Sequence, residues 1–354
     1  MKKGFLFVLL FLSSIILSSC SQLEEYSFSF YDYMDTFISI NVSTDSQDKA
    51  DEIKLDIKEI YRTYHEITNN YLPLSENSGF ITNVYEINRT INEDVEIDKE
   101  LYDIMLEAKR LNTLTNGYFD VSIGKMVDAW KTVILDEAYQ YSEIPQNVYE
   151  NIILQLESID VVENPFVLTE TAGKYYIRLT DENVKIDLGA LSKGYATQVV
   201  YEYLVNRGIE YFSITAGSSS ISVGKKINRK SEMFHISLAN PVSTSNTYGM
   251  IYVQNKAINT SGNFEQYALY NGLRYHHVVS PKTKLPAQYY HTVTVLGNDA
   301  GVLDALSTAL FSMPEDIFLA FIEQHQEDLG LEVIRFNYDE SITTYLLDTV
   351  YEEY

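Results

Sequence analysis

Cysteine is almost absent from this 354-residue sequence, which has one, Cys20. A single cysteine excludes a disulfide within the chain, so the fold must be stabilised by its hydrophobic core. Hydrophobic residues make up 45% of the sequence, which is enough for a sizeable core. The sequence also lacks internal repeats and low-complexity blocks, so we expect a globular protein rather than a repeat array.

Basic residues are also scarce. The chain has 26 Lys and Arg against 50 Asp and Glu, and its formal net charge is −24. Nucleic acids select basic surfaces, so this composition argues against a nucleic-acid partner.

The one long apolar run lies at the N-terminus, at residues 4–17. It follows Lys2 and Lys3 and is followed by small residues before Cys20. This order is typical of a secretory signal, and the run is too short for an ordinary spanning helix. Small residues before a lone cysteine resemble the lipobox of bacterial lipoproteins.

That resemblance implies cleavage before Cys20 and a diacylglycerol on its sulfur. We therefore expect a lipoprotein signal peptide at residues 1–19, a tether at 20–27 and a folded domain at 28–354. The domain would be anchored by lipid to the cell membrane and would face outside the cytoplasm. The alternative is a plain signal peptide with an incidental cysteine.

Hydrophobic periodicity predicts helices and short strands in one unit. Helices are expected at 45–69, 98–116, about 192–207, from a cap at Asn298 or Asp299 to 311, and after Pro314. Strands are expected at 37–43, 211–216, 220–224, 234–239, 249–254 and 291–297, with a closing hairpin at 331–336 and 343–348. The fold class is therefore α+β, a single domain of mixed, largely antiparallel sheet with packed helices.

One polar pair could bind a metal ion. Asp304 and Thr308 are one turn apart, so they share a face of the predicted helix. A carboxylate and a hydroxyl form half of a hard-cation site, which Mg²⁺ completes with substrate phosphates and water. The alternative is a solvated Asp304 beside a threonine bonded to its own helix.

Two further segments could bind an anionic ligand. At Lys193 a helix begins after a strand and a glycine bend, and backbone amides at a helix start attract phosphate. Asp120 follows a helix-ending glycine, where it could accept hydrogen bonds from a nucleotide or cap its own turn.

Seven motifs in chain order resemble the ApbE family of FAD:protein FMN transferases, over about residues 30–330. They are YMDTF, NGYFDVSIGKMVDAW, IDLGALSKGYA, ITAGSSSISVG, INTSGNF, RYHHVVSPKT and DALSTALF. Many members of this family are exported lipoproteins.

The resemblance assigns a role to particular residues. It implies that Asp304, Thr308 and the backbone carbonyl of Ala190 bind magnesium and that His277 is the general base, with His276 as a structural neighbour. The residues implied to bind FAD are Met34, Tyr71, Tyr118, Phe119, Asp120, Asp187, Lys193 and Val278.

The implied reaction moves FMN from FAD to a threonine or serine hydroxyl of an extracytoplasmic protein and releases AMP. Acceptors in this family are flavoprotein subunits of membrane redox systems. The alternatives are a FAD pyrophosphatase that forms FMN and AMP, and a flavin-binding lipoprotein without catalysis.

Some positions depart from the family pattern. Ser280 replaces an acid that would orient or charge the base. The others are Asp35 and Lys284 in place of glycines, Gln198 in place of a common aspartate, and Thr215 and Ser218 in an altered asparagine–alanine–glycine–glycine motif.

Overall fold

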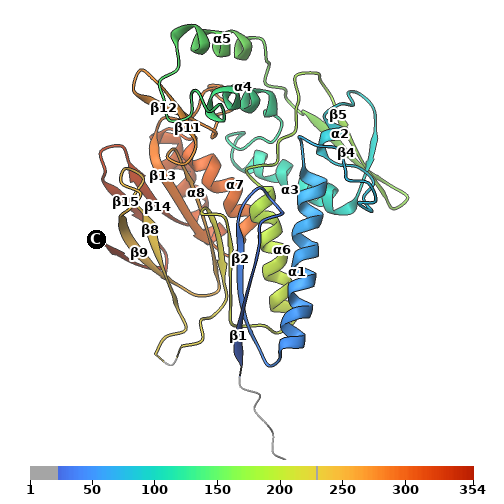
Figure 1. Cartoon of the computed structure of the whole chain (residues 1–354). Helices are drawn as coiled ribbons and strands as arrows, with labels where there is room; N and C mark the ends of the chain where they lie inside the picture. The colour runs from blue at the N-terminus through green and yellow to red at the C-terminus, as the bar shows by residue number, and fades with distance from the viewer. Residues whose placement is uncertain (1–22, 229) are drawn as a thin grey trace, which may run out of the picture.

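The computed structural model describes residues 23–228 and 230–354, and its middle layer is an eight-stranded antiparallel sheet (Figure 1). In spatial order the strands are β1 (Glu24–Phe30), β2 (Ile38–Thr44), β6 (Phe212–Ala216), β7 (Ser220–Val223), β10 (Lys256–Gly262), β13 (Tyr290–Gly297), β14 (Glu332–Asn337) and β15 (Ile342–Tyr345).

Three smaller sheets surround this layer. They are β16 (Val350–Glu353) with β9 (Thr247–Val253) and β8 (Phe234–Ala239); β3 (Val95–Ile97) with β5 (Lys174–Leu179) and β4 (Phe166–Thr171); and the hairpin of β11 (Tyr267–Tyr270) and β12 (Leu273–His276).

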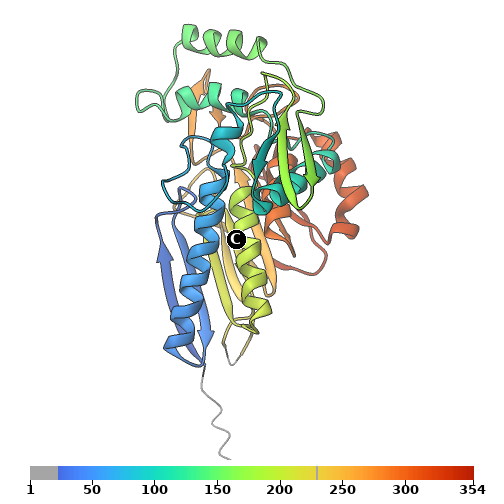
Figure 2. The same ribbon diagram turned by 90° about the vertical axis from the view of Figure 1, so that its right-hand side faces the viewer.

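Helices α1, α6 and α7 pack on the large sheet, and Figure 2 shows α1 and α6 side by side along it. The helices are α1 (Gln47–Thr68), α2 (Val84–Ile87), α3 (Lys99–Leu114), α4 (Gly124–Ile134), α5 (Gln146–Glu157), α6 (Ser192–Asn206), α7 (Ala300–Phe311) and α8 (Glu315–Leu329).

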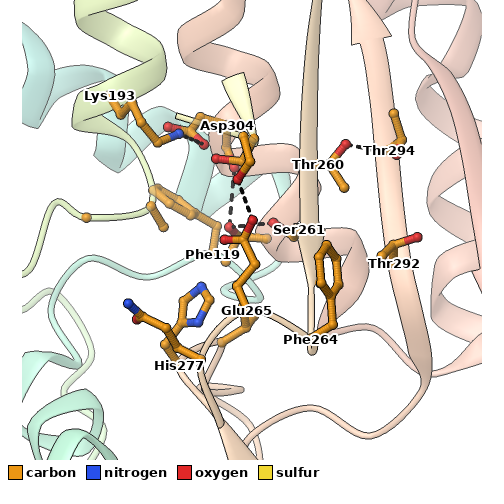
Figure 3. A pocket seen from close by; sticks show the side chains of 18 of the residues that line it. Phe119, Lys193, Thr260, Ser261, Phe264, Glu265, His277, Thr292, Thr294 and Asp304 are labelled. Atoms are coloured by element: carbon orange, nitrogen blue, oxygen red, sulfur yellow. Dashed lines mark hydrogen bonds and ion pairs between the residues drawn. The ribbon is translucent and has the colours of Figure 1, made fainter. Parts of the chain in front are cut away.

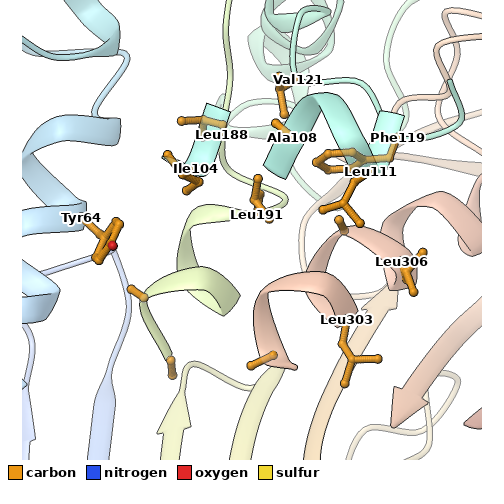
Figure 4. Close-up of a cluster of buried hydrophobic side chains, with 14 of the residues drawn as sticks. Tyr64, Ile104, Ala108, Leu111, Phe119, Val121, Leu188, Leu191, Leu303 and Leu306 are labelled. Atoms are coloured by element: carbon orange, nitrogen blue, oxygen red, sulfur yellow. The ribbon is translucent and has the colours of Figure 1, made fainter. Parts of the chain in front are cut away.

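The apolar stripe of α1 explains how it packs. Ile53, Ile57 and Tyr61 recur at intervals of four residues and are fully buried, whereas the opposite face carries charged side chains. The core continues between α3, α6 and α7, where Ile104, Leu111 and Leu303 lie in one cluster (Figure 4). This core fixes the start of α6 and the middle of α7, which both carry predicted site residues.

A second cluster holds α4 and α5 against the β11–β12 hairpin. Trp130 of α4 stacks on Tyr275 of β12 with ring centroids 4.9 Å apart, and its Nε1 donates a hydrogen bond of 3.0 Å to the carbonyl of Lys284. The chain around His277 is therefore held by aromatic packing on one side.

The α+β class is confirmed, as are the predicted helices and the closing hairpin, which is β14 paired with β15. The strand predicted before the glycine bend that leads to Lys193 is wrong: the chain there makes only an isolated bridge, between Lys185 and Ile123. The other predicted strands are confirmed. The structure adds elements that the sequence analysis did not predict, notably α4, α5 and the β11–β12 hairpin.

The predicted tether of residues 20–27 is wrong from Glu24 onward. These residues begin β1, which pairs with β2 from Glu24 opposite Thr44 to Phe30 opposite Ile38. Phe30 is buried at the end of that strand, so core packing extends the domain toward the N-terminus. Cys20 lies outside the described residues.

Within residues 23–228 and 230–354, no helix is both long enough and apolar enough to cross a membrane.

Candidate active site

A cavity of about 460 Å³ lies where α6, α7 and the end of β10 meet the chain after β12. Ten of the twelve residues predicted to bind FAD or magnesium or to act as the base line it. They are Tyr118, Phe119, Asp120, Asp187, Ala190, Lys193, His277, Val278, Asp304 and Thr308. Side chains far apart in the sequence therefore face one space, as Figure 3 shows for Lys193, His277 and Asp304.

Asp304 lies at the contact between α6 and α7 and is only 7% exposed. Its Oδ2 accepts a hydrogen bond of 2.8 Å from the backbone N–H of Gly194, and its Oδ1 lies 3.5 Å from Nζ of Lys193. Thr308 follows one turn later, and its Oγ1 donates to the Asp304 carbonyl at 3.3 Å. Asp304 and Thr308 therefore share the helix face that lines the cavity, and Thr308 also makes the bond to its own helix that the alternative interpretation expected.

Glycine at position 194 permits this contact. A Cβ there would lie 2.5 Å from Cβ of Asp304 and would also collide with the carbonyl oxygen of Ala300. Only a residue without a side chain lets the two helices approach so closely.

The donor set fits a magnesium ion that is bound mainly through its substrate. Asp304 supplies one carboxylate, and Thr308 and Ala190, which have a hydroxyl and a backbone carbonyl to offer, line the same cavity. In the part of the chain that the structure describes, no group of three or more acidic, histidine or cysteine side chains could hold a metal. Mg²⁺ commonly binds through one or two carboxylates plus substrate phosphates and water, so a single carboxylate suits it.

The rim of the cavity carries a lysine that sequence analysis missed. Nζ of Lys131 lies 3.1 Å from Oδ2 of Asp187 and donates a hydrogen bond to the hydroxyl of Tyr71. Burial lowers the pKa of Lys131, but Asp187 and Tyr71 outweigh it and the net pKa is raised, so this lysine is a permanent cation. Tyr71 is half-exposed and is not part of the lining; it reaches the cavity through Lys131.

Asp120 both lines the cavity and caps its own turn. Its Oδ1 accepts hydrogen bonds from the backbone N–H of Ser122 at 2.8 Å and from its hydroxyl at 2.6 Å. Burial raises the pKa of Asp120, while Ser122 and the cation of Lys282 oppose the rise. Asp120 can therefore cap its own turn, as one interpretation of the sequence expected, and still be available to a nucleotide in the cavity, as the other expected.

The adjacent histidines have different environments. His276 is fully buried; its Nε2 donates to the carbonyl of Ala287 at 2.8 Å, and its Nδ1 accepts the N–H of Val278 at 3.2 Å. Burial lowers the pKa of His276 to about 3, so this ring stays neutral. The side chain of His277 is open to the cavity.

Met34 lies outside the cavity lining, packed against the main core. Its N–H donates a hydrogen bond of 3.1 Å to Nδ1 of His65, and both Met34 (φ 57°) and Asp35 (φ 49°) have left-handed backbone. Lys284, with φ 62°, is left-handed as well. Asp35 and Lys284 are positions where the family pattern has glycine, which adopts this conformation without a Cβ penalty.

The other unusual positions have structural partners. Gln198 accepts the N–H of Ala300 at 3.0 Å and so caps the start of α7. Ser280 is buried, and its hydroxyl accepts the N–H of Lys282 at 3.3 Å, within a turn. Thr215 lies within β6.

Glu265 was not predicted from the sequence, and neither was the inner arm of the cavity, which is the part lined by β8, β9 and the strands β7, β10 and β13 of the large sheet. No local pattern marks these residues, because a lone glutamate in a loop and alternating apolar residues in strands are common. The inner arm is lined by Ile221, Ile236, Leu238, Tyr248, Ile258, Thr292 and Thr294.

The fold and cavity define a ligand-binding α+β domain whose site joins cations, carboxylates and a histidine. The chain belongs to the ApbE family, because the model of that family matches residues 34–333.

The curated relatives include three proteins named FAD:protein FMN transferase. The Vibrio cholerae protein is 28% identical over 67% of this chain and 68% of its own length, and the Haemophilus influenzae protein is 26% identical over 67% of each. The Buchnera aphidicola protein is 25% identical over 62% of each, so the match spans less than two thirds of that relative.

Solved structures share the fold. The ApbE protein of Thermotoga maritima superposes with a TM-score of 0.72 at 24% identity, over 91% of this chain and 97% of its own. The flavin transferase ApbE of Vibrio cholerae superposes with a TM-score of 0.70 at 22% identity, over 92% and 98%.

Proposed function

We propose that this protein transfers FMN from FAD to a hydroxyl of a threonine or serine in another protein and releases AMP. The observation that carries the proposal is that His277, Lys193 and the Asp304–Thr308 pair line one cavity. The names of the curated relatives support the same reaction.

In the reaction the acceptor oxygen attacks the phosphorus of the FMN half of FAD. A new phosphorus–oxygen bond forms, the pyrophosphate bond breaks, and AMP leaves with the bridging oxygen. A hydroxyl is a weak nucleophile until its proton is removed, and a neutral imidazole is suited to this role. His277 would accept the proton, since its side chain enters the cavity.

The cations of the site would hold the phosphates. Lys193, at the start of α6, is aimed by its contact with Asp304. Asp304, Thr308 and the carbonyl of Ala190 would hold Mg²⁺, which supplies positive charge as negative charge develops on the phosphates. Lys131 and Asp187 at the rim would contact the remainder of FAD, with Tyr71 beside them.

The acceptor and the location of the protein are further parts of the proposal. We propose a lipid-anchored enzyme at the outer face of the cell membrane, with Cys20 as the modified residue. Its acceptor would be a flavoprotein subunit of a membrane redox system. The apolar run at residues 4–17 and the small residues before Cys20 support the anchor.

The test is transfer of FMN from FAD, with Mg²⁺, to a peptide that contains one threonine. His277→Ala should reduce transfer by about 10²- to 10⁴-fold, the usual range for loss of a general base, and leave FAD binding intact. His325→Ala, on α8 outside the cavity lining, is the matched control and should transfer at the parent rate.

The products of this assay distinguish the proposed transferase from the alternative functions. Free FMN and AMP without a labelled peptide would indicate a FAD pyrophosphatase. FAD that binds and is recovered intact would indicate a flavin-binding protein. Equal transfer by the parent and His277→Ala would remove the assignment of His277 as base.

A further inference from the structure

Glu265 is a carboxylate of the cavity that the proposed reaction leaves without a role. It lies between β10 and β11, and its side chain enters the cavity with that of His277 (Figure 3). The hydroxyl of Ser218, in the turn between β6 and β7, donates a hydrogen bond to Oε1 of Glu265. The hydroxyl of Tyr141 donates a hydrogen bond of 2.7 Å to the Glu265 carbonyl.

These two contacts come from segments far from Glu265 in the chain. Ser218 is 47 residues away and Tyr141 is 124 residues away. An exposed glutamate in a loop ordinarily samples several rotamers, whereas here the backbone and the carboxylate are each held. The carboxylate of Glu265 is therefore positioned within the cavity rather than free in solvent.

The other carboxylates of the cavity are already engaged. Asp187 pairs with Lys131, and Asp304 contacts Lys193 and Gly194. Asp120 accepts two hydrogen bonds from Ser122. Among the described cavity residues, Asp120 and Glu265 are the carboxylates without an ion-pair partner, and of the two it is Glu265 whose charge acts on His277.

We propose that Glu265, held by Ser218, is the positioning carboxylate of His277 and stabilises the imidazolium that forms when this ring accepts the proton of the acceptor hydroxyl. The inference rests on the proposed transfer reaction and names a residue that acts through the base. Ser280 supplies no carboxylate near the ring, so the carboxylate comes from a different loop.

Several charged groups face His277 and set the sign of the effect. The surrounding cavity walls lower the pKa of His277, and the cations of Lys131 and Lys193 lower it further; Glu265 and Asp187 oppose them. Removing the charge of Glu265 should therefore lower the pKa of His277 and make it a weaker base.

The first measurement is the pH profile of FMN transfer at saturating FAD and Mg²⁺. In Glu265→Gln the acid limb should move to lower pH by about 0.5–1 unit, the effect of one solvent-screened charge within the same cavity. The plateau rate at high pH should fall several-fold, because a weaker base removes the proton less effectively. Ser218→Ala should give a smaller change in the same direction, and Glu265→Asp should recover part of the loss.

The control is Glu143→Gln, which removes a carboxylate that accepts the N–H of Gly272 in the neighbouring hairpin. It changes the net charge equally and should leave the acid limb in place. High salt should shrink the shift in Glu265→Gln, since exposed charges are screened.

The second measurement separates this inference from the proposed function. The imidazole signals of His277 are titrated by NMR without FAD, with His277→Ala used to assign them. A lower midpoint in Glu265→Gln than in the parent and Glu143→Gln is expected. An unchanged midpoint would overturn the inference, whatever the activity. Failure of the parent to transfer FMN would overturn the proposed function, and the midpoint would still show whether Glu265 acts on His277.

Discussion

His276 and His277 are adjacent in sequence, but one side chain packs in the core and the other enters the cavity. His276 makes two hydrogen bonds with backbone groups and contacts the ring of Phe311, with centroids 5.4 Å apart. Its role is to hold the chain from which His277 projects. A neutral, fully bonded imidazole does this well, because a buried charge there would have no partner.

This environment predicts a pH dependence of stability. The pKa of His276 is about 3 in the folded protein and about 6.5 when the chain is unfolded, so the unfolded state binds a proton first as pH falls. The stability that neutral His276 contributes to the folded state is fully present above pH 6.5. It is lost as the pH falls toward 3, at about 1.4 kcal/mol per pH unit.

The measurement is the free energy of unfolding in urea at pH 7, 6 and 5, for the parent and for His276→Gln. The variant should be less stable at pH 7 but should lose less stability between pH 6.5 and 5. The carboxylates titrate in both proteins, so their effect on the free energy of unfolding cancels in the comparison. Equal slopes of the free energy of unfolding against pH in the two proteins would show that His276 takes up its proton in the folded state as readily as in the unfolded state.

At the scale of elements, the contact of α6 with α7 sets the geometry of the site. Gly194 lets the helices approach, and its N–H holds the carboxylate of Asp304. The hydroxyl of Tyr61, on α1, lies 3.0 Å from that of Thr197, so α6 is also tied to α1. Three helices thus determine where one carboxylate points.

Gly194→Ala should disturb both stability and metal binding. We expect a loss of about 1–3 kcal/mol, the usual cost of overpacking, because the Cβ would collide with backbone as well as with Asp304. Thermal unfolding and Mg²⁺ titration are the measurements.

Val205→Ala is the control for that substitution, since Val205 is an exposed residue of the same helix and should change both quantities little. Wild-type stability and Mg²⁺ affinity in Gly194→Ala would mean that the helices can separate without cost.

At the scale of the whole molecule, a buried carboxylate joins the two sheets that carry the C-terminal part of the chain. Glu332 of β14 is fully buried and forms an ion pair with Lys256 of β10. Its Oε2 also accepts the N–H groups of Leu347, at 3.2 Å, and Thr349, at 3.0 Å. The chain then continues into β16, which pairs with β9.

Glu332→Ala should destabilise the protein by about 3–5 kcal/mol, because it removes the buried partner of Lys256, which keeps only Asp348 and the hydroxyl of Thr349, and leaves two backbone donors without an acceptor. Asp348→Ala removes an exposed carboxylate that contacts the same lysine and should cost less than about 1 kcal/mol. Equal costs in urea unfolding would contradict the role assigned to Glu332.

Local sequence patterns predicted much of the fold. The spacing of apolar residues in α1 and the cap at Asp299, whose side chain accepts the N–H of Val302, involve neighbours within four or five residues. α4 escaped prediction although its apolar face packs on the β11–β12 hairpin, since its short pattern overlaps a motif that was interpreted for ligand binding.

The motifs shared with the family contain most of the residues that line the cavity. The composition by itself excluded disulfides within the chain and argued against a nucleic-acid partner. Only the tertiary structure brought Lys193 to Asp304, 111 residues away, and Ser218 to Glu265. Contacts at such separations depend on how strands order in a sheet and how closely helices pack. The sequence determines these contacts through the whole core at once, so no short pattern marks Glu265, Lys131 or the start of β1.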